Sequence, residues 1–166
     1  ARYEGTRQCQ TEFGKCASLA SAFKRCLQEY LNSIPDPVVY NWIQSKILAL
    51  KACDIASERG QKTVLKGIQT ASGTQLLHQF HFNRLQKIET LLLATPEMHM
   101  ETGVLTLSSG QMTIQISGSK DPCRLQLLMV RMNFETYQYE LAASSFYYFD
   151  AASIDAIVLT SPIPKG

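Results

Sequence analysis

Apolar residues in the first third of the chain recur at alternating steps of three and four. This spacing places them on one face of an α-helix and predicts a helix over about 9–32. Because Gly14 and several serines lower intrinsic helix propensity, we expect this helix to depend on packing against other parts of the protein. Its apolar face is wide enough for two neighbours, and it consists of Phe13, Cys16, Ala20, Phe23, Leu27 and Tyr30.

A second amphipathic pattern predicts a helix over about 37–58. Asp36 and Pro37 are typical of an N-cap and a first helical position, and Gly60 is typical of a helix end. The short connection between the two helices predicts an antiparallel helical hairpin. Asp54, Arg59 and Gly60 lie at its end. We expect Asp54 and Arg59 to form a charge pair there, and these three residues to orient the helices against the rest of the protein.

From residue 61 the pattern changes to short runs, several of them alternating, separated by glycines. Strands are predicted by this alternation, although the segment 77–92 also fits a helical period. The two parts together predict an α+β fold, in which residues 1–60 form a helical arm and residues 61–166 form an antiparallel β-sandwich or open barrel. The predicted strands cover 105–107 and 112–116, which form a hairpin, and then 125–132, 137–141, 145–149 and 156–159.

Composition narrows the functional classes. The chain has 166 residues, 45% of them hydrophobic and 18% charged, compared with a usual charged share of about 25%. This composition excludes simple disorder and suggests that part of the surface is apolar and covered. The net charge of +2 argues against a nucleic-acid partner. No run of about 18 apolar residues exists, so we expect no membrane insertion.

The five cysteines form no C-x-x-C pair. A zinc site is therefore not expected, and free, buried thiols are the favoured interpretation. Because no apolar leader precedes the first helix, we expect the chain to fold in the cytoplasm, while its final compartment stays open. Later release or assembly at a surface is compatible with this interpretation.

Catalytic and cofactor signals are weak. His78 and His81 could join a metal site if they lay on a helix, but ordinary histidines are the favoured interpretation. Cys123 has no recognisable base beside it, and no phosphate-binding glycine motif is present. We therefore expect no catalytic residue, no metal and no cofactor, and we expect that the protein is not an enzyme.

A dense aromatic segment lies near the C-terminal end. In a strand, the side chains of Phe146, Tyr147, Tyr148 and Phe149 alternate between two faces, so two of them point away from one core. Three interpretations stay open at this point. The rings are covered within the same chain, or they contact another protein chain, or they form a platform for a ligand.

One stretch of the chain resembles a known sequence pattern. The residues are Asp54, then Arg59-Gly60-Gln61-Lys62, then Leu76-Leu77-His78-Gln79-Phe80-His81-Phe82-Asn83. They are similar to R-G-Q-R and L-L-x-G-F-x-F-N in an uncharacterised family of bacterial proteins. There, a helix with E-F-G comes first, as in Glu12-Phe13-Gly14. Lys62 and Gln79 differ from the arginine and glycine of that pattern. The resemblance covers about 7–83 and implies a bacterial origin and a shared scaffold, without an activity.

These patterns lead to one main hypothesis and two alternatives. The main hypothesis is a structural, self-assembling subunit of an oligomer, tube or filament, whose partner is a second copy of itself. Its contacts would use Phe13, Phe23, Leu27, Tyr30, Phe146, Tyr147, Tyr148 and Phe149. The first alternative is a monomeric module that binds a glycan or a protein through the aromatic strands. The second alternative is a small hydrolase.

Overall fold

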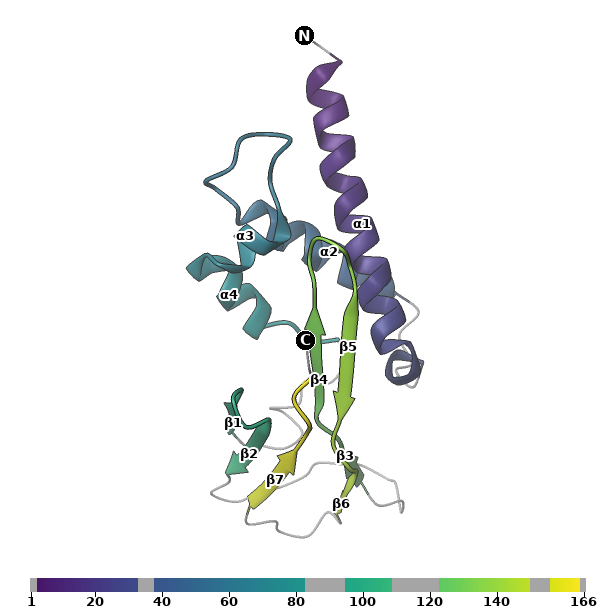
Figure 1. Ribbon diagram of the computed structural model, residues 1–166, viewed down its shortest axis with the longest axis vertical. Helices are drawn as coiled ribbons and strands as arrows, with labels where there is room; N and C mark the ends of the chain where they lie inside the picture. Colours follow the sequence, from purple (N-terminus) through teal and green to yellow (C-terminus); the bar gives the residue numbers. More distant parts are fainter. Residues whose placement is uncertain (1–2, 33–37, 83–94, 109–122, 150–155, 165–166) are drawn as a thin grey trace. The chain divides into compact units, whose positions relative to one another are not determined.

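The computed structural model describes residues 3–32, 38–82, 95–108, 123–149 and 156–164 (Figure 1). The chain divides into two compact units. The first consists of residues 1–83 and 132–139, and the second of residues 84–131 and 140–166. The first unit contains the helices, and each unit is described separately below.

The first unit is built on one long helix, α1, which spans Glu4–Leu31. Its C-terminal two-thirds are buried over a wide face, as the apolar spacing predicted. The helix begins earlier than predicted, since its first turns are mostly polar and lie outside the apolar pattern. The buried apolar residues are Cys16, Leu19, Ala20, Ala22, Cys26, Leu27 and Leu31.

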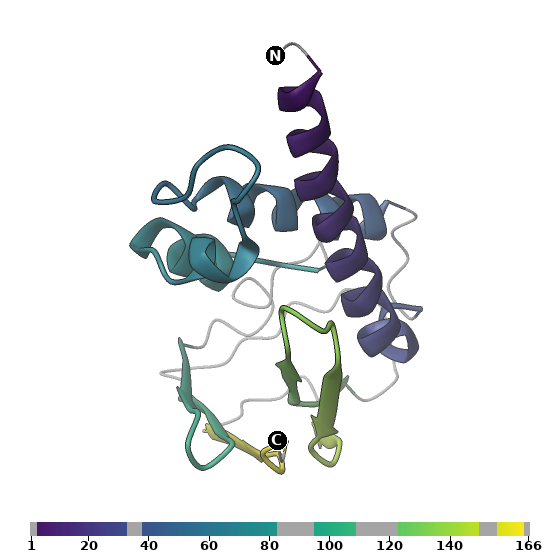
Figure 2. The ribbon, with the colours of Figure 1, turned by 45° about the horizontal axis from the view of Figure 1, so that its top comes forward.

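Helix α2 spans Val39–Ala52 and buries Ile43, Ile47 and Leu50. It ends earlier than the predicted residue 58, because the chain turns at Asp54, whose carboxylate binds the Ser57 N–H. The predicted cap at residues 36–37 lies outside the described residues. Figures 1 and 2 show α2 crossing α1, where the short connection had predicted an antiparallel hairpin.

Two short helices follow where the sequence predicted strands or an ambiguous segment. Helix α3 spans Val64–Ile68 and helix α4 spans Ala71–His78. A threonine hydroxyl caps each one, since Thr63 Oγ1 accepts a hydrogen bond from Lys66 N–H and Thr70 Oγ1 accepts one from Gly73 N–H. Helical structure therefore continues past the predicted boundary at residue 60, and residues 61–83 belong to the first unit.

Glycines bring these helices close together. A Cβ atom on Gly67 would collide with the carbonyl of Leu50 on α2, and a Cβ atom on Gly73 would collide with the carbonyl of Gly67. Gly67 and Gly73, which the sequence pattern placed between short strands, instead allow backbone contact between helices.

The second unit contains a three-stranded antiparallel sheet in the order β1-β2-β7. Its strands are β1 (Thr95–His99), β2 (Val104–Ser108) and β7 (Ala156–Thr160). Leu107 pairs with Ile157, and Leu105 pairs with Leu159. These side chains point to one face, where Leu107, Ile157 and Leu159 form a buried cluster. Val158, on the opposite face, is 56% exposed, as expected for a sheet with one covered face.

The other four strands form two ladders. Residues 126–127 on one side and 144–146 on the other separate the two ladders. Strand β3 (Cys123–Leu125) pairs with β6 (Tyr147–Phe149), and β4 (Leu128–Met132) pairs with β5 (Tyr139–Ala143). Between the ladders, the buried Ser144 hydroxyl accepts a hydrogen bond from Leu127 N–H, and Ser144 N–H donates to the Leu127 carbonyl. The predicted strand over 125–132 is therefore split at Gln126–Leu127.

The α+β class is confirmed by these elements. The described strands form antiparallel ladders, whereas a sandwich or barrel arrangement of them stays a prediction. The predicted strand at 112–116 lies outside the described residues. In the described part of the chain, no helix is long and apolar enough to span a bilayer.

Candidate functional site

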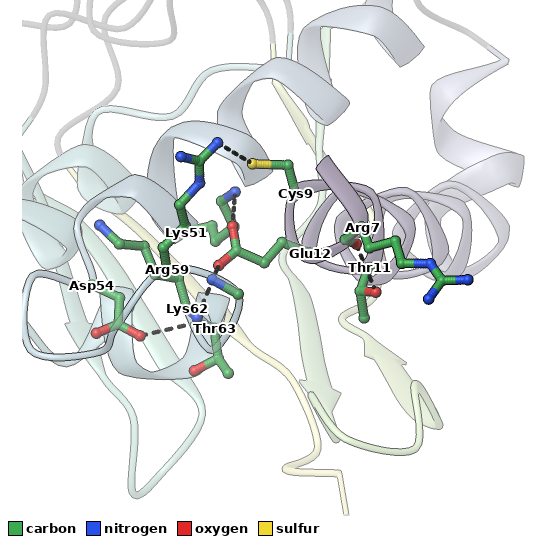
Figure 3. Close-up of polar contacts among 10 residues, drawn as sticks. Arg7, Cys9, Thr11, Glu12, Lys51, Asp54, Arg59, Lys62 and Thr63 are labelled. Carbon is green, nitrogen blue, oxygen red and sulfur yellow. Dashed lines mark hydrogen bonds and ion pairs between the residues drawn. The ribbon is translucent and has the colours of Figure 1, made fainter. Parts of the chain in front are cut away.

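A buried carboxylate organises the first unit. Glu12 on α1 is 4% exposed and accepts three hydrogen bonds (Figure 3). Oε2 accepts one from Lys51 Nζ on α2 at 2.8 Å, while Oε1 accepts one from Gly60 N–H at 2.6 Å and one from Lys62 N–H at 3.2 Å. Burial raises the pKa of Glu12, but these hydrogen bonds and the nearby ammonium outweigh it and lower the pKa below its ordinary value.

A second buried carboxylate holds the other side of the same loop. Asp54 is 1% exposed, and its oxygens accept hydrogen bonds from Thr63 N–H at 3.0 Å and Ser57 N–H at 3.1 Å. The bond from Thr63 is the main reason that the pKa of Asp54 is lowered. The two carboxylates thus fix the segment 55–63 to α1 and α2. We call this segment, together with Glu12 and Asp54, the clamped loop.

The predicted charge pair between Asp54 and Arg59 is wrong. Asp54 binds backbone N–H groups, and Arg59 Nη2 instead donates to Cys9 Sγ on α1 at 3.3 Å (Figure 3). Gly60 has a φ of 93°, and a Cβ atom there would lie 2.8 Å from Gln8 Cβ. Gly60 therefore supplies both the left-handed turn and the close approach to α1. The role of these residues in orienting the arm stays a prediction.

The residues predicted for contacts on α1 differ in exposure. Phe13 is 49% exposed, whereas Phe23 and Tyr30 are partly buried. Leu27 is 6% exposed, so it is covered within the chain and does not contribute to an open surface. Of the predicted apolar face, Cys16, Ala20 and Leu27 are buried, Phe23 and Tyr30 are partly accessible, and Phe13 is the most exposed.

The aromatic segment near β6 alternates between covered and open side chains. Phe146 is 43% exposed and Tyr148 is 61% exposed, with ring centroids 6.1 Å apart. Tyr147 points the other way and packs against the cluster of Leu107, Ile157 and Leu159. The side chain of Phe149 lies outside the described residues. The guanidinium of Arg124 on β3 lies 5.1 Å from the Phe146 ring centroid, and we call Arg124, Phe146 and Tyr148 the aromatic patch.

The candidate metal ligands were the histidines and the candidate nucleophile was Cys123, whose side chain lies outside the described residues. His78 ends α4, while His99 lies on β1 in the other unit. Across the described ranges, no group of three His, Cys, Asp or Glu side chains could hold a metal ion. Cys16 and Cys26 are buried free thiols, and burial raises the pKa of both.

Comparison of the chain with protein-family models, with curated proteins and with solved structures finds no match. The resemblance of residues 7–83 to a bacterial family therefore stays a prediction. Any functional conclusion has to come from the geometry of the two units themselves.

Proposed function

We propose that this protein is a structural subunit that assembles with copies of itself. The observation that supports the proposal best is the aromatic patch, where Phe146 and Tyr148 expose large ring surfaces side by side. Fully burying one such side chain contributes about 1.5–3 kcal/mol, and aromatic residues are enriched at protein interfaces. Two adjacent rings with an arginine provide the residue types that dominate interface energetics.

Phe13 supplies a second apolar contact on the other unit. It is half exposed, and among the described residues no other part of the chain lies within 4 Å of the position that a Cβ on the neighbouring Gly14 would take. A neighbouring chain could therefore approach the helix backbone closely at this point. Two different apolar surfaces on one chain permit a heterologous contact, in which one surface binds the other on the next copy, and such contacts build rings or filaments.

The proposal is tested by sedimentation velocity of the full chain at several concentrations. We expect the average mass to rise with concentration, and we expect the double variant F146S/Y148S to shift this rise to higher concentration. The variant I55S is the matched control, because Ile55 is 85% exposed but lies in the clamped loop, outside both contacts. If F146S/Y148S sediments like the parent chain and like the control I55S, the aromatic patch does not mediate assembly.

A second candidate function uses the same patch for a ligand. The exposed Tyr148 ring offers a flat apolar face, and Arg124 beside it offers hydrogen-bond donors, a combination suited to a glycan or a protein loop. This alternative predicts a monomer that binds a glycan array and loses that binding in Y148A. Binding without any concentration-dependent mass would favour it over assembly.

A further inference from the structure

The first unit contains a cavity of about 300 Å³, which is at the small end of the range for ligand pockets. All of its lining residues belong to that unit. They come from three segments, namely α1, the end of the clamped loop with the start of α3, and the turn after β4. The lining residues that carry the argument are Lys15, Leu19, Lys62, Val64, Phe134 and Tyr137.

The cavity has a positive side. Lys15 and Lys62 both line it, and within the described residues neither ammonium group has a hydrogen-bond or ion-pair partner. Glu12 also lines the cavity, but its carboxylate already binds Lys51 and two backbone N–H groups. Glu135 also lines the cavity, and its side chain is exposed on the turn, where solvent screens its charge. The buried acidic group of the lining is thus paired with Lys51, which leaves Lys15 and Lys62 available to an anion.

Most of the remaining wall is apolar, and part of it lies on a turn with its own hydrogen bonds. Phe134 and Tyr137 lie on a turn in which the Asn133 carboxamide oxygen accepts hydrogen bonds from the N–H groups of Glu135 and Thr136. Tyr137 has a φ of 60°, a left-handed conformation that is unfavourable for a bulky residue. Residues held in such conformations cluster at functional sites, and Tyr137 is one of the residues that line the cavity.

We propose that this cavity binds a small organic anion, with its apolar body against Leu19, Val64, Phe134 and Tyr137 and its carboxylate or phosphate group at Lys15 and Lys62. Carboxylates and phosphates are the groups that ammonium side chains bind best. The proposal is independent of assembly, because none of these residues belongs to the aromatic patch and Phe13 does not line the cavity.

The test is calorimetric titration of the full chain with phenyl phosphate, benzoate and benzylamine. These probes share an aromatic ring and differ in the charged group. We expect phenyl phosphate or benzoate to bind and benzylamine not to bind, and the stronger of the two anions identifies the preferred group. K15Q and K62Q should each weaken anion binding about three- to tenfold, as expected for loss of one partly exposed charge contact.

Two further variants make the result specific. R25Q removes one positive charge from an exposed position on α1 that does not line the cavity, so it should bind as the parent chain does. Y137N keeps a residue that tolerates the left-handed conformation but removes the ring, and it should weaken binding. The proposal is overturned if neither anion binds, if benzylamine binds equally well, or if K15Q and K62Q bind like R25Q.

Discussion

Replacing Glu12 by glutamine should destabilise the first unit strongly. An amide keeps the shape of the carboxylate but carries a nitrogen in place of one oxygen. That nitrogen would face either Lys51 Nζ or the N–H groups of Gly60 and Lys62, so a donor would meet a donor. Removing one member of a buried ion pair costs about 3–5 kcal/mol. Because the Lys51 side chain is 18% exposed and keeps some hydration, we expect the lower end, about 3 kcal/mol.

The free energy of unfolding can be measured by urea titration with the fluorescence of Trp42, the single tryptophan. Trp42 lies on α2 in the same unit, and its Nε1 donates a hydrogen bond to the His81 carbonyl at 2.8 Å. Glu29→Gln is the matched control, since Glu29 is exposed on the same helix. A loss below about 1 kcal/mol in E12Q, similar to that in E29Q, would refute the role given to the buried carboxylate.

Three other outcomes are expected. Gly67→Ala should lower the free energy of unfolding by about 1–3 kcal/mol, because its Cβ would collide with the Leu50 carbonyl. Gly14→Ala should raise it by about 0.5–1 kcal/mol in a urea titration, because alanine favours a helix more than glycine does. Both carboxylates of the clamped loop have a lowered pKa in the folded state, so the stability they contribute is complete above a pH of about 4–5 and is lost as the pH falls further. Urea titrations between pH 6 and about 3 should show this decline in the free energy of unfolding, and a flat profile would contradict it. In iodoacetamide labelling followed by peptide mass mapping, the exposed Cys9 should react well before the buried Cys16, and equal rates would contradict the burial described.

The sequence predicted the long helix because its apolar period is regular over many turns. The same period could not show which part of the face is covered, since Phe13 and Leu27 are equivalent in the pattern but differ in their neighbours. Helices α3 and α4 were missed because five and eight residues are too few to display a period. Thr63 and Thr70 were the available signals, as each stands three residues before the backbone N–H that it caps.

Most of the clamped loop could not be predicted from residue types. A charge pair between Asp54 and Arg59 is the natural expectation from side-chain charge, but the structure satisfies Asp54 with backbone N–H groups that any sequence carries. Glu12 did leave a signal, since it is a charged residue four positions before Cys16 on the buried face of the helix. A charge on a buried face requires partners, and their identity depends on the loop that folds against it.

The central proposal is that copies of this chain bind one another, and sedimentation equilibrium of the purified full chain tests it most directly. The chain mass is 18.6 kDa, so assembly predicts an average mass that rises above this value as concentration increases. A mass that stays at 18.6 kDa over the whole accessible concentration range would contradict the proposal.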